Sequence, residues 1–292
     1  MIDKKFAWNR WQRILIGLGI GYSLVCLALF TLQERLMFFP SRTLEHTPSL
    51  YQLEYQDVWI SISQGERTEK LHGWWIPAQQ PNAPVILYFH HNAINIGANV
   101  SQALQFHQLG YSIFLFDYRG FGQSQGAFPT EVQVYEDAQA VWNYLTQERK
   151  ILPNQIVIYG HSIGGAIAID LAARHPEAAA LIVQSSFTSM RDMTKRFGLY
   201  WLLPVELILR QRFESLEKMK SVRMPVLIVT GTEDLQIPIE MGEHLYNAAP
   251  KFKKLIVVQG GGHDNHLSVQ DRQSVKHFVQ QAMWQYSNRK SI

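Results

Sequence analysis

One serine in this chain stands in a pattern that suits covalent catalysis. Ser162 is the centre of the sequence G-H-S-I-G at positions 160–164, a G-x-S-x-G pattern. Residues 156–159 before it are apolar and mostly β-branched, which predicts a buried strand, and the small residues after it begin a predicted helix. Because a sharp turn from strand to helix lifts a hydroxyl clear of the sheet, this context predicts a nucleophile elbow.

A nucleophilic serine needs a base to take its proton and an acid to orient that base. Glu233 and Asp234 follow an apolar run at 226–229, and His263 and His266 follow another at 255–258. Both runs read as buried strands, and open α/β sheets place their sites beyond the carboxyl ends of their strands. The order serine, acid, histidine is that of the elbow architecture. The residues alone leave both pairs of candidates open.

Further motifs link the serine to a known family. The chain from about residue 36 onward resembles the α/β-hydrolase superfamily, in particular its membrane-anchored branch with a serine aminopeptidase-like domain. The resemblance rests on motifs in the expected order: F-H-H-N-A-I-N at 89–95, D-Y-R-G-F-G-Q-S-Q-G at 117–126, G-H-S-I-G-G at 160–165, G-T-E-D at 231–234 and G-G-G-H at 260–263. It implies a triad of Ser162, Asp234 and His263, and it favours Asp234 over Glu233 and His263 over His266.

The resemblance also implies an oxyanion hole, in which two backbone N–H groups face the developing negative oxygen. One should be the amide of Ile163, and the other should come from His91 or Asn92, in the turn after a predicted strand at 85–90. The family pattern has glycine where this chain has His91 and Ile94. Since these side chains restrict positive φ, either the loop takes another path or the hole is impaired. The intact triad favours the first reading.

The remaining pattern predicts one large α/β domain. Predicted strands alternate with helical segments such as 130–146, which indicates a mostly parallel, doubly wound sheet covered on both faces. Residues 53–62 alternate imperfectly and suggest an edge hairpin with 71–76. The other predicted strands are 85–90, 112–116, 156–159, 180–184, 226–229 and 255–258. Asp117 and Arg119 are expected to brace a loop, and Ser185, Ser186 and Ser189 to be solvated turn residues.

The N-terminal region carries the second strong signal. No charged residue occurs from Ile14 to Leu32, a run of about 28 Å as a helix and close to the ~30 Å hydrocarbon core of a bilayer. We therefore predict a single-pass anchor within residues 1–35 and a hydrolase domain at 36–292. The basic residues before the run predict a cytoplasmic N-terminus and a catalytic domain on the non-cytoplasmic side. A cleaved signal peptide is the rival, but no small-x-small site follows the apolar run.

A short cap is expected at about 187–224. Its apolar residues around Phe197, Tyr200 and Trp201 either contact an acyl chain of the substrate or the membrane surface, or pack on the core. With an anchor and no acidic cluster to bind an amine, a lipid-like ester or thioester is a more economical substrate than a peptide. The function predicted is a serine hydrolase. The rival from another class is a catalytically weak or silent scaffold, a membrane-tethered binding protein.

Composition excludes several other functions. The net charge of +3 comes from the first residues, and the rest of the chain has as many basic as acidic residues. A nucleic-acid-binding domain needs a basic surface, so none is expected. The single cysteine, Cys26, cannot form a disulfide within the chain or a cysteine metal site. No metal and no organic cofactor is expected, and the oligomeric state is left open.

Overall fold

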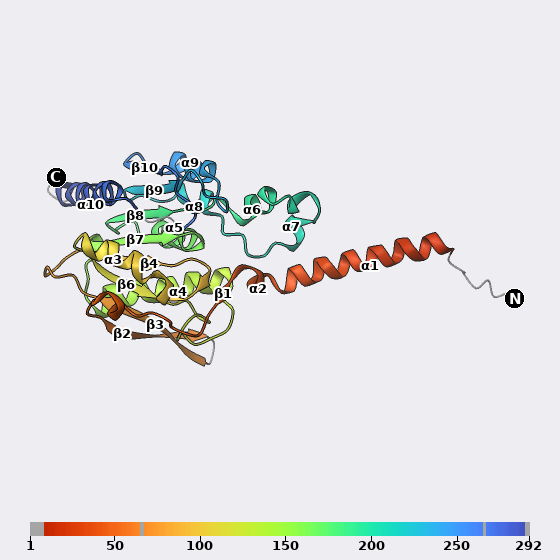
Figure 1. The fold of residues 1–292 in the computed structure, drawn as a ribbon, viewed down its shortest axis with the longest axis horizontal. Coiled ribbons are helices and arrows are strands. Elements are labelled where there is room, and N and C mark those ends of the chain that lie inside the picture. Colours follow the sequence, from red (N-terminus) through yellow and green to blue (C-terminus); the bar gives the residue numbers. More distant parts are fainter. Residues whose placement is uncertain (1–8, 65–66, 265–266, 290–292) are drawn as a thin grey trace.

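A twisted sheet of eight strands forms the centre of the protein (Figure 1). The computed structural model describes residues 9–64, 67–264 and 267–289. The strand order is β10-β9-β8-β7-β4-β6-β3-β2. The strands are β2 (Gln56–Gln64), β3 (Arg67–Ile76), β4 (Val85–Phe89), β6 (Ser112–Phe116), β7 (Ile156–His161), β8 (Ala180–Gln184), β9 (Val226–Gly231) and β10 (Lys253–Val258). Strand β3 pairs antiparallel with β2 and β6, and the other neighbours are parallel.

Helices cover both faces of this sheet. Helices α3 (Val100–Gln108) and α10 (Val269–Arg289) pack on one face, where their apolar side chains share a core with the strands. The helices of the other face are α4 (Glu131–Asn143), α5 (Ile163–Arg174), α8 (Ser215–Met219) and α9 (Ile239–Ala248). The predicted fold class, a mostly parallel doubly wound α/β sheet, is confirmed.

The central strands are apolar on both faces because both faces are covered. In β4, Leu87 and Phe89 belong to the core on the α5 side, while Ile86 and Tyr88 belong to the core on the α3 side. Parallel strands with two buried faces read as continuous apolar runs, which is why the sequence located them within a few residues. The hairpin of β2 and β3 is confirmed, but β2 begins at Gln56 rather than 53.

The predicted helix at 130–146 is divided into two parts. Helix α4 begins after Thr130, whose side chain forms a capping box with Gln133. It ends at Asn143, and a π-helical turn, η3 (Tyr144–Glu148), follows. Three 3-10 turns lie in the connections of the domain: η1 (Pro48–Tyr51), η2 (Ile96–Asn99) and η4 (Pro153–Gln155).

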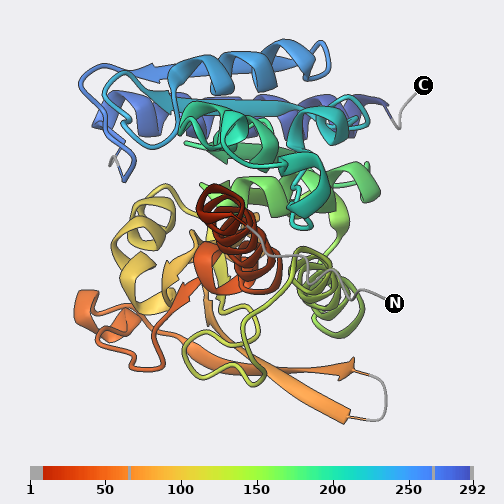
Figure 2. The ribbon, with the colours of Figure 1, turned by 90° about the vertical axis from the view of Figure 1, so that its right-hand side faces the viewer.

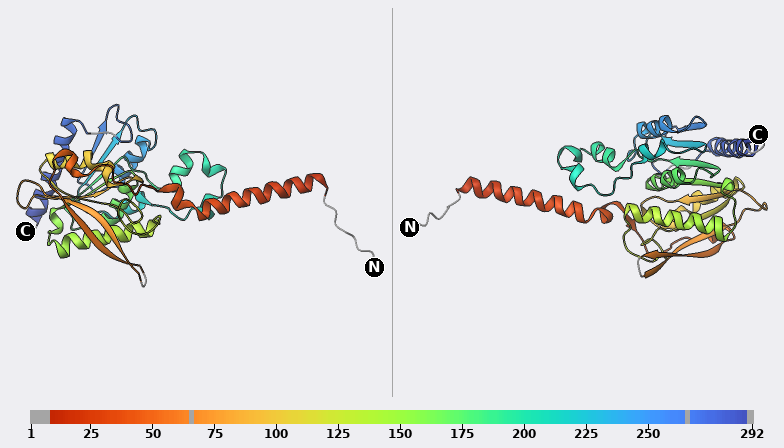
Figure 3. Two further views of the ribbon diagram at one scale, coloured as in Figure 1. Left: turned by 60° about the horizontal axis from the view of Figure 1, so that its bottom comes forward. Right: turned by 180° about the vertical axis from the view of Figure 1, so that it is seen from behind.

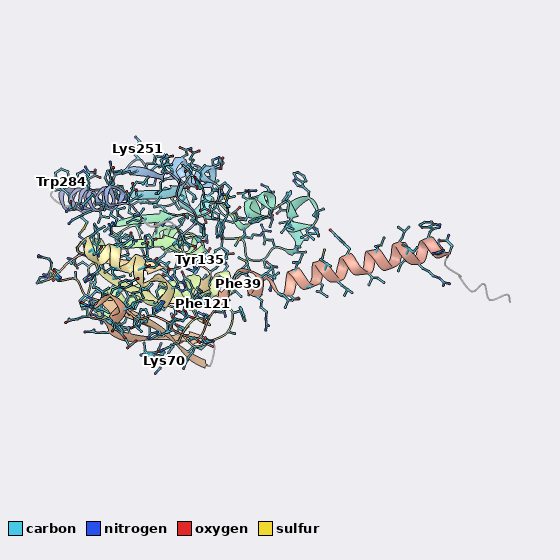
Figure 4. All side chains as sticks on the ribbon, in the orientation of Figure 1. Phe39, Lys70, Phe121, Tyr135, Lys251 and Trp284 are labelled. Carbon is cyan, nitrogen blue, oxygen red and sulfur yellow. The ribbon has the colours of Figure 1, made fainter. Side chains whose placement is uncertain are left out.

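A long helix projects from the domain at its N-terminal side (Figure 1). Helix α1 (Arg10–Thr31) has no buried residue, and it is long and apolar enough to cross a membrane. Its 22 residues correspond to about 33 Å. The short helix α2 (Gln33–Met37) follows it, and Phe39, labelled in Figure 4, lies two residues further on, where the N-terminal helices meet the domain.

The cap lies beside α1 (Figures 2 and 3). It consists of α6 (Met190–Arg196), the 3-10 turn η5 (Leu199–Trp201) and α7 (Val205–Ile208), followed by α8 in the predicted 187–224 segment. Residues of α7 contact α1 directly. The cap and the N-terminal helices therefore lie together at one end of the domain.

The turn from β7 to α5 is built from glycines because there is no room for side chains. Ser162, between the two elements, has φ 57° and ψ −123°. A Cβ at Gly160 would lie 2.2 Å from the carbonyl oxygen of Gly164, and one at Gly164 would lie 2.2 Å from that of Phe89. The helix can start this close to the strands only without those atoms.

We predict that Gly164→Ala lowers the free energy of unfolding by about 3 kcal/mol or more, because the added methyl group meets rigid backbone. Denaturant unfolding of the purified protein measures this. Gly19→Ala in α1 is the matched control, since no heavy atom lies within 4 Å of the added group. Equal stability of Gly164→Ala and wild type would contradict the packing described here.

Candidate active site

Three side chains from separate loops form a continuous chain of hydrogen bonds. Ser162 Oγ lies 3.0 Å from His263 Nε2, and His263 Nδ1 lies 2.8 Å from Asp234 Oδ2. A carboxylate only accepts, so Nδ1–H donates to Asp234 and Nε2 accepts from the serine hydroxyl. The geometry therefore fixes the imidazole tautomer that a general base requires.

Asp234 is held in its ionised form. Its side chain is 0% exposed, and burial alone raises the pKa of a carboxyl group. Hydrogen bonds from His263 and from the amides of Ile237 and Gln236 outweigh burial and bring the pKa of Asp234 below its ordinary value. The two amides donate to Oδ1 over 2.8 and 2.9 Å, so Oδ2 is left for the histidine.

The competing acid, Glu233, is not the carboxylate that binds His263. Its side chain is exposed, while its backbone N–H donates to the carbonyl of Gly261 over 2.9 Å. A second bond runs from the amide of Gly260 to Thr232 Oγ1. Glu233 thus helps to join the acid loop to the histidine loop. The competing base, His266, lies outside the described residues.

His161 is a site residue that the sequence analysis missed. Its Nε2–H donates over 3.0 Å to the carbonyl oxygen of His263, which fixes the backbone of the base. Burial, reinforced by the neighbouring His263 and His91, lowers the pKa of His161 to about 4. A neutral His161 adds no positive charge beside the imidazolium that His263 must become. Its place within G-x-S-x-G was the only signal in the sequence.

The predicted oxyanion donors lie around the nucleophile. Ile163 is the first residue of α5, where backbone N–H groups have no acceptor within the helix. The turn after β4 is adjacent, because β4 pairs with β7 and the Cα of Gly164 faces the carbonyls of Phe89 and His90. His91 is partly buried, with its ring centroid 5.7 Å from that of His161.

Ile94 takes the conformation that glycine would have. Its φ is +61°, whereas His91 has no positive φ. The loop therefore keeps a glycine-like path at Ile94, and left-handed backbone at such a residue costs about 1–3 kcal/mol. The segment after α2 compensates: β1 (Phe39–Pro40) pairs with β5 (Ala93–Ile94), and Ser41 N–H donates to the carbonyl of Ile94 over 2.8 Å.

Asn92 is fixed by the same segment. Its side-chain Nδ2 donates to the carbonyl of Met37 over 2.7 Å, and its carbonyl accepts from the N–H of Phe39 over 2.8 Å. His91 Nδ1 accepts from the N–H of Ala93, and burial lowers the pKa of His91. The whole turn is therefore held by hydrogen bonds, and its histidine is neutral.

The structure shows the bonding partners of the polar residues that the sequence placed in neighbouring loops. Arg119 forms a buried ion pair with Asp137 of α4 at 2.6 Å, so its bracing role is confirmed. Asp117 accepts a hydrogen bond from the N–H of Ile96.

The prediction of solvated serines is wrong, because Ser185, Ser186 and Ser189 are all buried. Ser186 Oγ donates to the carbonyl of Ser162 over 2.7 Å and so supports the elbow; Ser189 caps α6.

The three cap residues named from the sequence lie in different places. Phe197 lines an apolar groove between the cap and the N-terminal helices. Tyr200 OH accepts a hydrogen bond from Arg191 and lies 3.4 Å from a carboxylate oxygen of Glu206. Trp201 is 83% exposed.

One group of side chains in the described part of the chain could approach a metal ion. Ligand atoms of His161, His263 and Asp264 lie within 4.8 Å of one another. However, both ring nitrogens of His263 are engaged by Asp234 and Ser162, and His161 Nε2 donates to a carbonyl. A metal ion would have to break these bonds, so the arrangement suits proton transfer better than metal binding.

The elbow, the sheet order and the serine–histidine–aspartate contact define an α/β-hydrolase. A family model described as serine aminopeptidase, S33, matches residues 80–212. An uncharacterized protein of Mycobacterium tuberculosis, Rv2307c, is 33% identical over 242 residues, which is 82% of this chain and 84% of that protein. The chain belongs to the α/β-hydrolase superfamily and carries a domain of the S33 type.

A second relative agrees with this assignment, and a solved structure shares the fold. The alpha/beta hydrolase domain-containing protein WAV2 of Arabidopsis thaliana is 31% identical over 229 residues, covering 72% of this chain and 73% of that protein. The esterase Pf2001 of Pyrococcus furiosus has the same fold, with a TM-score of 0.68, 20% identity, and coverage of 85% of this chain and 98% of that chain.

We predict that Asp234→Asn lowers kcat by about 10⁴-fold, because the amide favours the wrong imidazole tautomer. The neighbouring change Glu233→Gln is the matched control and should stay within about tenfold of wild type, since its side chain is exposed. Steady-state ester hydrolysis by the two purified variants decides between them. A larger loss in Glu233→Gln would reverse the assignment of the acid.

Proposed function

We propose that this protein is a membrane-anchored serine hydrolase that cleaves an ester or thioester with a lipid-like acyl group. The observation that carries the proposal is the hydrogen-bonded chain from Ser162 through His263 to the ionised Asp234. Membership of the α/β-hydrolase superfamily and the likeness to esterases support the same class of reaction. No cofactor is needed for it.

The first half of the reaction forms an acyl-enzyme. Ser162 Oγ attacks the acyl carbonyl carbon while His263 Nε2 takes the hydroxyl proton. The carbonyl π electrons move to oxygen, and the amide of Ile163 with one from the His91–Asn92 turn stabilises that oxyanion. When the tetrahedral intermediate collapses, the bond to the alcohol or thiol breaks, and His263 returns the proton to the leaving group.

The second half restores the enzyme. A water molecule gives a proton to His263 and attacks the acyl carbon. The bond to Ser162 Oγ breaks, the carboxylic acid leaves, and the serine recovers its proton from the imidazole. Asp234 stays ionised throughout, since its hydrogen bonds keep its pKa low, and it stabilises the imidazolium in both halves.

Two alternatives compete with this function. A silent scaffold would account for the strained Ile94 and for histidine in place of glycine at position 91. A peptidase would agree with the description of the family model. The apolar groove beside the site favours an acyl chain over the charged amine of a peptide.

The test of the function is labelling by a fluorophosphonate probe. We expect the wild-type protein to react covalently and to hydrolyse p-nitrophenyl esters, and Ser162→Ala to lose both activities at an unchanged folded yield. Thr188→Ala, a buried hydroxyl outside the triad, is a control for the general effect of such a change. Substantial hydrolysis by Ser162→Ala would falsify the nucleophile assignment, and an inert wild type would favour the scaffold.

The proposed location is a single-pass membrane protein whose N-terminus is cytoplasmic and whose catalytic domain is on the other side. The support is the apolar helix α1, in which no residue is buried, together with the basic residues that precede residue 14. A cleaved signal peptide remains the rival, because a helix near the N-terminus can serve either purpose.

We predict that the full-length protein resists carbonate extraction, because α1 spans the bilayer. Protease added to the non-cytoplasmic side should digest the catalytic domain, and digestion only from the cytoplasmic side would reverse the orientation. N-terminal sequencing of the mature protein distinguishes the anchor from the signal peptide: a first residue beyond Thr31 would contradict the anchor.

A further inference from the structure

An apolar groove lies between the N-terminal helices and the cap. Its volume is about 310 Å³, at the low end of the 300–1,000 Å³ typical of ligand pockets. Side chains from α1, α2 and the cap line it, among them Leu29, Leu36, Met193, Phe197, Leu203 and Ile208. Such a narrow apolar space suits one flexible hydrocarbon chain better than a polar or bulky molecule.

One end of the groove reaches the turn after β4, which lies next to the nucleophile elbow. Asn92, in the turn expected to supply an oxyanion donor, is among its lining residues, and so is Met37, whose carbonyl accepts from the Asn92 side chain. An acyl chain in the groove would therefore end beside the turn that is expected to supply an oxyanion donor. The groove thus adjoins the turn that faces the elbow of Ser162.

The other end lies along the predicted membrane span. Leu29 belongs to α1, and Tyr22, further along the same helix, donates its hydroxyl to the carbonyl of Leu202 in the cap over 3.0 Å. Tyr22 lies nine residues before Thr31, which is about 14 Å along the helix. If α1 spans a bilayer, the tip of the cap therefore lies at the depth of one leaflet.

The surface of the cap is suited to that depth. Phe197, Leu199, Trp201, Leu202 and Leu207 are all large, apolar and exposed. An exposed apolar cluster of this kind marks a contact with another molecule or a membrane.

Four charged side chains of the cap form two ion pairs with one another. Arg191 pairs with Glu206 at 2.5 Å, and Lys195 pairs with Asp192 at 2.9 Å. Long basic side chains can also extend their charge toward the headgroups. These pairs reduce the cost of placing the cap against lipid.

The groove has a fixed shape because the anchor is joined to the cap. Gln33, only 7% exposed, donates to the carbonyl of Ile208 over 2.6 Å. Its Oε1 accepts from the backbone N–H groups of Arg210 and Gln211, and Glu34 forms an ion pair with Arg210 at 2.8 Å. These bonds therefore hold the C-terminal end of the anchor in a fixed position against the cap.

We propose that this groove is the acyl-chain subsite of the hydrolase, that the anchor helix forms one of its walls, and that a lipid ester enters it sideways from the leaflet that surrounds the cap. The inference rests on the proposed function and adds a role to α1. The helix contributes to substrate selection as well as to attachment.

The test compares chain-length selectivity in the full-length, detergent-solubilised protein. The quantity is the ratio of kcat/KM for p-nitrophenyl dodecanoate to that for p-nitrophenyl acetate. Leu29→Trp fills the groove from the anchor and Thr194→Trp fills it from the cap, so each should lower the ratio at least tenfold. Leu27→Trp, on the same helix but exposed and outside the groove, should leave the ratio within twofold of wild type.

The outcomes separate this inference from the proposed function. If the wild type hydrolyses both esters and both groove variants keep its ratio, the acyl subsite is wrong while the hydrolase remains. An equal fall in Leu27→Trp would also overturn the subsite. If the wild type hydrolyses neither ester and does not react with a fluorophosphonate, the proposed function is wrong, and the proposed acyl subsite is then wrong as well.

A second measurement tests the depth of the cap without using activity. A nitroxide is attached at Leu202→Cys in a Cys26→Ser background, and the protein is reconstituted into phosphatidylcholine vesicles. We expect higher collision with oxygen than with a water-soluble nickel chelate, as for a site in lipid. Leu152→Cys, exposed at the opposite end of the sheet, should give the aqueous pattern. An aqueous pattern at position 202 would overturn access from the leaflet.

Discussion

The left-handed backbone of Ser162 is the constraint on which the rest of the site depends. A non-glycine residue at φ 57° and ψ −123° costs about 1–3 kcal/mol, so its surroundings must enforce it. Gly160 and Gly164 let α5 approach the strands, and Ser186 donates to the carbonyl of Ser162. The resulting position places Oγ in front of His263 and puts the amide of Ile163 at the helix start.

A second strained residue connects this site to the N-terminal helices. Ile94 holds positive φ, and its carbonyl is bound by Ser41, immediately after β1. Asn92 is bound on both sides by Met37 and Phe39. The segment that leaves α2 thus supports the turn after β4, which is expected to supply an oxyanion donor. Hydrogen bonds therefore connect the segment that follows the N-terminal helices directly to a loop beside Ser162.

Much of this architecture could be predicted from the sequence. Periodicity located the central strands, because strands buried on both faces are apolar throughout. The motif order gave Ser162, Asp234 and His263, which the structure brings together. Burial of Ser185 and its neighbours could not be predicted, since serines after a strand are usually solvated.

The sequence by itself determined the elements, the elbow and the apolar span of α1, because each is encoded in a short contiguous run whose composition fixes local structure. Only the tertiary structure decided which residues meet across long separations. His161 supports the backbone of His263, 102 residues away, and Gln33 joins α2 to Ile208, 175 residues away. The reason is physical: a hydrogen bond between distant segments depends on how the whole sheet and its helices pack, and no local pattern records it.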